Sequence, residues 1–414
     1  MWMYHNIFLL FVLFITTMAE DLQEKFSQNN AKFSLNLYSQ VKKDNADKNI
    51  IISPFSIQTC VALAYAGAGG KTAEEISSGL HLIGNDKNVV GESFKNVLDL
   101  YKDSPLLKIA NKFYVKVGYQ VKDEFNTIAT KYFYSEAENI QFEEKVEAAA
   151  KMNNWVEERT NNKIKNLIKP DVLDSLTRMI LINAIHFKGE WQHKFKESAT
   201  QKENFWISET ESVKVDMMNT KKNFRYGEFD DLDATALEMP YKNSNLSMLI
   251  LLPRRKTGLS NLEEKLQGIS LTNITQNMFF NEVIVKFPKF KTEFEIELTN
   301  TFEKMGMGSM FSDDADFSNL LDSPEPLKVS QIVHKAFIEV NEEGAEAAAA
   351  TAAVIRMKRS APISKHFTVD HPFLYAIISR DSQHKFIVFY GCIKSFIKNM
   401  TDSAKTCSDC RDEL

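Results

Sequence analysis

Hydrophobic residues follow two different spacings along this chain of 414 residues. Over residues 21–168 helical spacing dominates, with apolar side chains at Phe26, Phe33, Leu35 and Leu37 and again at 61–65 and 148–156. Farther along, short apolar segments recur between turn-rich or polar stretches and indicate β-strands at 179–187, 246–252, 283–287 and 386–389. Helices and strands mix without a regular βαβ alternation, so the pattern predicts an α+β fold with a helical N-terminal half. With no internal repeat and no long linker, we expect one large domain.

Composition narrows the classes of function. The chain is 44% hydrophobic and 25% charged, as in ordinary soluble globular proteins. A net charge of -5 argues against a nucleic-acid-binding protein, which needs a basic surface for phosphate contacts. The sequence contains no glycine-rich phosphate loop and no paired-cysteine zinc spacing, so we expect no nucleotide, cofactor or metal site. No Ser, His and Asp arrangement stands out as a hydrolytic triad, which argues against a protease.

The two ends of the chain both carry targeting features. An apolar run at 7–15, followed by small residues up to Ala19 and the acidic Glu20, predicts a secretory signal peptide at 1–19. A buried helix or a membrane anchor is the alternative, but the run is shorter than the roughly 20 residues that span a bilayer. The chain ends with Arg-Asp-Glu-Leu at 411–414, which resembles the Lys-Asp-Glu-Leu retrieval signal. We therefore expect a main domain at 20–398, a polar tail at 399–414, a retrieval receptor as partner and residence in the endoplasmic reticulum lumen, with partial secretion as the alternative.

Four cysteines would meet an oxidising lumen in such a protein. Cys60 and Cys392 lie in apolar runs, so we expect buried small hydrophobic side chains there. Cys407 and Cys410 form a Cys-x-x-Cys in the polar tail, where a local disulfide or a link to a partner is favoured over a redox site. Three sites have the form of N-glycosylation acceptors, the first weakened because it leads straight into an apolar strand: Asn245, Asn273 and Asn399.

The segment 342–360 joins very small side chains to a basic cluster. Its alanines favour a helix by intrinsic propensity, but it has no stripe of large side chains to anchor a helix, and Gly344 and Thr351 weaken one further. The alternative is a segment that is exposed in one state and inserts into a sheet in another. Small side chains at every second residue meet little steric resistance there.

A series of motifs follows in order along the chain. They are NIIISPFSI at 49–57, NNWV at 153–156, LINAIHFKGEW at 181–191, EMPY at 238–241, FPKF at 287–290, DFS at 316–318, VHKA at 333–336 and DHPFL at 370–374. Together they resemble the serpin family of serine protease inhibitors along nearly the whole chain after the leader. The resemblance implies large mixed β-sheets, an exposed reactive-centre loop at about 342–366 and a monomer.

The same resemblance implies roles for individual residues. A serine protease would attack the loop as a substrate and form an acyl-enzyme, after which the loop would insert into the main sheet and distort the tethered protease. The hinge of that movement would comprise Glu342, Glu343, Gly344, Ala345, Ala347, Ala349 and Thr351. A polar cluster called the shutter, beneath the place where the sheet opens, would comprise Ser53, Ser56, Asn183 and His334, with no catalytic role. Three aromatic residues are expected to be structural: Trp155, Trp191 and Phe373.

The basic cluster predicts the target. Arg356, Lys358 and Arg359 precede Ser360 in a pattern that resembles the Arg-x-Lys-Arg site of furin-like proprotein convertases. Cleavage after Arg359 would break the Arg359–Ser360 bond, whereas loop length counted from Gly344, as in typical inhibitory serpins, would place the attack at Lys358–Arg359. The sequence thus predicts a convertase inhibitor. The alternatives are a secreted inhibitor of trypsin-like proteases and a non-inhibitory serpin or chaperone that is cleaved as a substrate.

Overall fold

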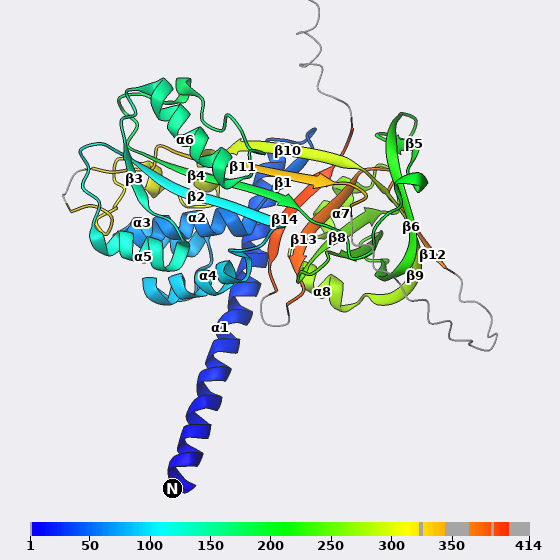
Figure 1. Cartoon of the computed structure of the whole chain (residues 1–414), viewed down its shortest axis with the longest axis horizontal. Coiled ribbons are helices and arrows are strands. Elements are labelled where there is room, and N and C mark those ends of the chain that lie inside the picture. Colours follow the sequence, from blue (N-terminus) through cyan, green and yellow to red (C-terminus); the bar gives the residue numbers. More distant parts are fainter. Residues whose placement is uncertain (1, 323–325, 344–363, 382–384, 397–414) are drawn as a thin grey trace, which may run out of the picture.

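The computed structural model describes residues 2–322, 326–343, 364–381 and 385–396. In the described part of the chain, α1 to α6 precede the strand Met179–Lys188, and the short helices α7 to α9 follow it (Figure 1). Ser53 caps the N-terminus of the second helix: its side chain accepts a hydrogen bond from the backbone N–H of Ser56, and Pro54 is the first residue of the helix. The helices are α1 (Trp2–Lys43), α2 (Pro54–Gly67), α3 (Gly70–Gly79), α4 (Lys87–Tyr101), α5 (Asp123–Phe133), α6 (Lys145–Arg159), α7 (Leu259–Lys265), α8 (Leu271–Gln276) and α9 (Thr299–Lys304).

A nine-stranded sheet forms one side of the molecule. Its strands follow the order β1-β14-β13-β8-β7-β6-β9-β12, and β5 pairs with β6. Every residue of β8, β13 and β14 is buried, because both faces of these strands are covered. The strands are β1 (Ile50–Ile52), β5 (Gln201–Trp206), β6 (Ser212–Phe229), β7 (Ala234–Pro240), β8 (Leu246–Pro253), β9 (Phe279–Pro288), β12 (Lys365–Thr368), β13 (Phe373–Ser379) and β14 (Ile387–Ile393).

A five-stranded sheet with the order β10-β11-β4-β2-β3 forms the other side. Its strands are β2 (Leu107–Lys116), β3 (Ala137–Ile140), β4 (Met179–Lys188), β10 (Phe290–Glu297) and β11 (Gln331–Val340). The odd-numbered apolar residues of β4 join a core cluster with α2, and its even-numbered apolar residues join a second cluster with α6. Helices α2 and α6 therefore cover opposite faces of this sheet (Figure 1).

Two strands in the middle of this sheet pair in parallel, and each has an antiparallel neighbour on its other side. Strand β11 pairs with β4 in parallel, from Gln331 opposite Ile180 to Glu339 opposite Lys188. Strands β10 and β2, on the outer sides of this pair, run antiparallel to β11 and β4. We call the β4–β11 boundary the seam.

The α+β prediction is confirmed, and the expected helical and strand segments lie in the elements predicted for them. Helical dominance over 21–168 was incomplete, because this part also contains β1, β2 and β3. Strand β2 has helices on one side and α6 on the other, so its ten residues lack the alternation that marks a half-exposed strand. Cys60 and Cys392 are buried and free, as expected.

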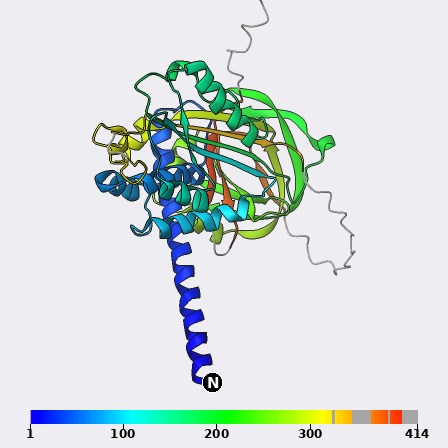
Figure 2. The same ribbon diagram turned by 60° about the vertical axis from the view of Figure 1, so that its left-hand side comes forward.

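Helix α1 continues without a break from Trp2 to Lys43 and therefore includes the expected leader. Its N-terminal half extends away from the rest of the molecule (Figures 1 and 2). None of the helices in the described residues is long and apolar enough to cross a membrane. Removal of residues 1–19 stays a prediction.

Candidate reactive-loop hinge and the polar cluster below the seam

The chain leaves the seam at residues 341–343, directly above the end of β4. The backbone N–H of Trp191 donates a hydrogen bond to the carbonyl of Glu343 at 3.0 Å, and its indole Nε1–H donates to the carbonyl of Asn341 at 2.8 Å. The indole is itself stacked on Tyr241, with ring centroids 4.6 Å apart. These contacts hold the start of the expected hinge against a rigid aromatic pair at one end of the seam.

Glu342 is anchored at the same point. Its side chain forms an ion pair with Lys289 at 2.8 Å and accepts a hydrogen bond from the Thr200 hydroxyl at 2.9 Å. Burial raises the pKa of Glu342, but the Lys289 ammonium and the Thr200 hydroxyl outweigh it, so the pKa lies below its ordinary value. The carboxylate therefore stays charged and fixed near neutral pH.

Glu343 makes a weaker contact. Its carboxylate lies 2.9 Å from the ammonium of Lys188, the last residue of β4. Both side chains are exposed, at 54% and 40%, so solvent screens the pair. The hinge is thus held firmly at Glu342 and loosely at Glu343.

The four residues expected to form the shutter meet below the middle of the seam. Ser53 and Ser56 lie at the start of α2, Asn183 on β4 and His334 on β11, and all four are fully buried. Asn183 and His334 are direct register partners across the seam. Residues far apart in sequence therefore form one hydrogen-bonded group under the two strands.

The hydrogen bonds define the protonation of His334. Its Nε2 accepts from the backbone N–H of Ser53 at 3.2 Å, so the proton is on Nδ1, which donates to Asn183 Oδ1 at 2.5 Å. Burial lowers the pKa of His334 to about 3. The ring is therefore neutral and acts as a structural link between β11, β4 and α2.

Asn111 on β2 completes the cluster and was missed by the sequence reasoning. Asn183 Nδ2 donates to the Ser56 hydroxyl at 2.6 Å and also to Asn111 Oδ1. Asn111 faces Asn183 in the antiparallel β2–β4 register. The only signal in the sequence is one amide inside a buried strand, which does not reveal its partners.

His186 is a second polar residue of the seam that sequence reasoning did not single out. It lies on β4 on the α6 side of the sheet, with its ring 5.4 Å from that of Phe337 on β11. Within the described residues neither ring nitrogen has a hydrogen-bond partner, and the side chain is only 5% exposed. Burial, followed by the nearby Lys163, lowers the pKa of His186 to about 4.

Comparison with known proteins identifies this arrangement. Residues 28–395 match the family described as Serpin (serine protease inhibitor). The chain is a serpin. It is 40% identical over 365 residues to Serine protease inhibitor 42Dd of Drosophila melanogaster, covering 87% of this chain and 95% of that protein. It is 37% identical to Antitrypsin of Bombyx mori over 382 residues, covering 90% and 96%. The structure titled Cleaved Serpin 42Da superposes with a TM-score of 0.82 at 44% identity, covering 92% of this chain and 100% of that one.

Membership of this family places the protein among the serine protease inhibitors, which are not enzymes and whose partners are serine proteases. Among the residues described here, no three His, Cys, Asp or Glu side chains gather as a metal site. Of the expected structural aromatics, Phe373 is fully buried and Trp191 supports the hinge. Trp155 packs against the Lys112 ammonium, which lies 5.2 Å from its ring centroid.

Other predicted site residues are exposed or lie outside the described part of the chain. Asn245 and Asn273 are exposed, which glycosylation requires. The remaining expected residues fall outside the described segments: Gly344, Ala345, Ala347, Ala349, Thr351, Arg356, Lys358, Arg359, Ser360, Asn399, Cys407 and Cys410.

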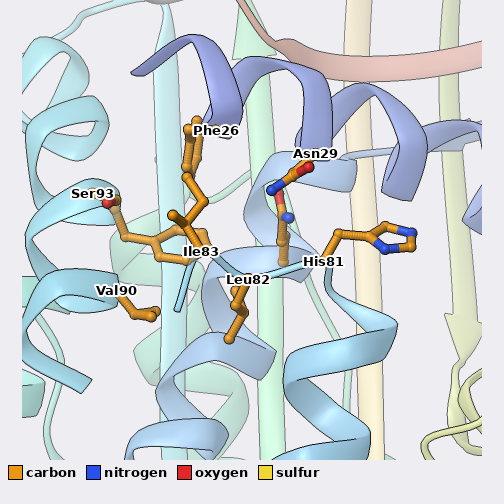
Figure 3. Close-up of a pocket in the computed structure, with 9 residues that line it drawn as sticks. Phe26, Asn29, His81, Leu82, Ile83, Val90 and Ser93 are labelled. Atoms are coloured by element: carbon orange, nitrogen blue, oxygen red, sulfur yellow. The ribbon is translucent and has the colours of Figure 1, made fainter. Parts of the chain in front are cut away.

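A small pocket lies on the helical side of this serpin (Figure 3). Phe26 from α1 and Val90 and Ser93 from α4 face Leu82 and Ile83 from the connection between α3 and α4. Its volume of about 10 Å³ has room for about one water molecule and is far below the roughly 300–1,000 Å³ of ordinary ligand pockets. We assign no ligand to it.

Proposed function

We propose that this serpin is a suicide-substrate inhibitor that traps furin-like, subtilisin-type proprotein convertases in the lumen of the secretory pathway. The convertase would attack the reactive-centre loop with its own serine and form an acyl-enzyme. Insertion of the cleaved loop into the five-stranded sheet would then carry the tethered protease across the molecule.

One observation carries this proposal: the chain leaves β11 at the end of a parallel seam and is held directly above it. A loop that turned back at Gly344 and entered the seam would run antiparallel to both β4 and β11. Insertion would replace one parallel boundary by two antiparallel ones, and antiparallel pairing is slightly more stable per residue. Insertion of the loop would therefore stabilise the five-stranded sheet.

The composition of the loop supports the same movement. Ala345, Ala347, Ala349 and Thr351 would occupy the buried face of an inserted strand if Glu346 faced solvent. All four side chains are small, so they can enter between packed strands with little steric cost. About fifteen residues at roughly 3.3 Å each would move the protease by about 50 Å. A shift of even about 1 Å in catalytic groups can slow a reaction about 100-fold, which would preserve the acyl bond.

The basic residues support the choice of target. Arg356, Lys358 and Arg359 would place three cations in the acidic pockets of a convertase that cuts Arg359–Ser360. Hydrogen bonds between ionised partners are worth about 1.5–3 kcal/mol each, and arginine adds bidentate geometry. The expected leader at 1–19 and the retrieval-like tail at 411–414 support residence in the compartment where such proteases act, with a retrieval receptor as second partner.

The test is incubation of the purified serpin with furin, followed by denaturing electrophoresis. We expect a stable covalent complex for the natural chain and none for Arg359→Ala, whereas Ala361→Ser, which alters a neighbouring uncharged residue, should still form it. The mass of the released C-terminal fragment identifies the bond, since it begins with Ser360 or with Arg359. Clean cleavage of the natural chain without a complex would reject inhibition and favour a non-inhibitory serpin.

A secreted inhibitor of trypsin-like proteases is the second candidate. Its support is the 37% identity to the protein named Antitrypsin and the loop length, which would place the attack at Lys358–Arg359. Trypsin should be tested beside furin. A complex with trypsin alone would favour this candidate.

A further inference from the structure

Two adjacent phenylalanines protrude from the end of the nine-stranded sheet. Phe279 and Phe280, the first two residues of β9, are 71% and 77% exposed. Among the described residues they are the largest of the strongly exposed apolar side chains, and they are neighbours in sequence. Because successive residues of a strand project to opposite faces, the two rings flank the end of β9 on its two sides. Exposed aromatic side chains beside polar groups are typical of binding surfaces.

The pair is held on a rigid support. Arg225 on β6 donates hydrogen bonds to the carbonyls of Thr275 and Met278, in the turn that leads into β9. Met278 is buried, and the Asn281 side chain donates to the carbonyl of Phe279 at 2.9 Å. Because this backbone is already ordered, burial of the two rings by a partner would cost little additional conformational entropy.

The position of the pair is set by the strand that follows the reactive-centre loop. Strand β12 runs parallel to β9, with Lys365 opposite Val283. Ser364, the first described residue after the loop, donates a hydrogen bond to Glu282 at 2.5 Å. Glu282 is two residues from Phe280, or about 7 Å along the strand. The loop therefore returns to the sheet right beside the exposed rings.

Chain length then limits the distance from the rings to the attacked bond. Only three residues lie between Ser360 and Ser364, so the four steps from one to the other span at most about 14 Å of extended chain. A protease domain of about 250 residues has a radius of gyration of about 18 Å. A protease bound at Arg359–Ser360 or at Lys358–Arg359 is large enough to reach Phe279 and Phe280 while its active site holds the loop.

The surroundings have the composition of a contact rim. Lys221 pairs with Glu282 at 2.9 Å, and Lys365 pairs with Glu228 at 2.8 Å, all four side chains being more than 40% exposed. An apolar centre with a charged, solvent-accessible edge is the usual arrangement of a protein interface. Aromatic side chains at the centre of such a surface commonly supply much of the binding free energy.

We propose that Phe279 and Phe280 form a docking surface for the target protease, on the side of the attacked bond that leads into β12. This inference rests on the proposed function, in that a protease attacks the loop. The surface would speed the first encounter and the attack on the loop. It would have no part in the competition between trapping and release, which is decided at the seam.

The test measures two quantities for the double variant F279A/F280A with furin and with trypsin. The first is kcat/KM for attack on the loop, summed over trapped and cleaved products; the second is the number of serpin molecules consumed per trapped protease. We expect the first to fall about tenfold for the target protease, corresponding to about 1.4 kcal/mol, and the second to stay constant. The variant F279Y/F280Y, which keeps the rings, should retain most of the rate.

Leu176→Ala is the matched control. Leu176 is 70% exposed but lies before β4, at the opposite end of the seam from the hinge, so its removal should leave both quantities unchanged. An unchanged rate of attack in F279A/F280A with both proteases would overturn the docking surface, whether or not complexes form. Cleavage without complexes would reject the trap alone. Dimers of the natural chain that dissociate in F279A/F280A would assign the surface to a second copy and also overturn the proposal.

Discussion

The seam of the five-stranded sheet and the buried strands of the nine-stranded sheet are built in opposite ways. In β8, β13 and β14 every residue is buried, and the strands pair antiparallel throughout. The seam is parallel and carries Asn183, His186 and His334. Both groups of strands are buried by apolar packing, but the seam also carries a buried cluster of polar side chains, whose hydrogen bonds can be exchanged with those of an entering strand.

The largest expected effect concerns the loop that would enter the seam. Ala347→Arg or Ala349→Pro should abolish the covalent complex and leave a cleaved serpin, because a bulky charge or a missing N–H obstructs insertion. Denaturing electrophoresis with the target protease measures the outcome. Ala348→Arg is the matched control, since that side chain would face solvent and the complex should persist. Equal complex formation in all three variants would refute insertion.

A core substitution in the nine-stranded sheet should lower the stability of the protein without changing its ability to trap a protease. Leu249 on β8 is fully buried, and Leu249→Ala should lower the free energy of unfolding by about 3 kcal/mol through lost packing and a cavity. Denaturant unfolding measures this loss. The number of serpin molecules consumed per trapped protease should not change. A change in that number would contradict the view that the core of the nine-stranded sheet has no part in loop insertion.

The buried His334 makes the free energy of unfolding depend on pH. Its pKa is about 3 in the folded protein, against 6.5 as its ordinary value, so the unfolded chain binds more protons between these values. The contribution of neutral His334 to the free energy of unfolding is fully present above about pH 6.5 and is lost progressively as the pH falls toward 3. The loss between pH 7 and pH 5 is about 2 kcal/mol. Unfolding at several pH values should show this slope.

His334→Gln supplies the control for the pH dependence. It should be less stable at pH 7 because the Ser53 N–H and the Asn183 amide lose their present partners, and its stability should vary less between pH 7 and 5. An unchanged slope would mean that His334 is not the group responsible. His186, whose pKa is about 4, is the next group to test.

The smallest effects concern the hinge contacts above the seam. Lys289→Ala should cost about 1–2 kcal/mol, because Glu342, only 8% exposed at its side chain, loses its cation. Lys188→Ala should cost under about 0.5 kcal/mol, since its pair with Glu343 is exposed. The difference in thermal midpoint between the two variants measures how firmly the hinge is anchored. Equal midpoints would contradict the anchoring at Glu342.

Much of this protein could be predicted from local sequence. Ordered motifs indicated the family, and apolar spacing indicated segments of α1, α2, α6, β4, β8, β9 and β14. The loop and the target inferred from the small and basic residues of 342–360 stay predictions. The residues expected beneath the opening, Ser53, Ser56, Asn183 and His334, are in fact brought together by the fold. These features could be predicted because each depends on the type of side chain and on its order along the chain.

Only the tertiary structure decided which strands became neighbours and where their edges ended. Asn111 joined the polar cluster because β2 lies opposite β4, and β4 met β11 across about 150 residues of intervening chain. Phe279 and Phe280 have the composition of core strand residues, yet they are exposed at the end of β9, where β6 still pairs with them but β12, which pairs with β9 only from Val283 onward, does not. The hydrophobic effect is non-directional, so a sequence states which side chains favour burial, whereas strand pairing decides which of them obtain it.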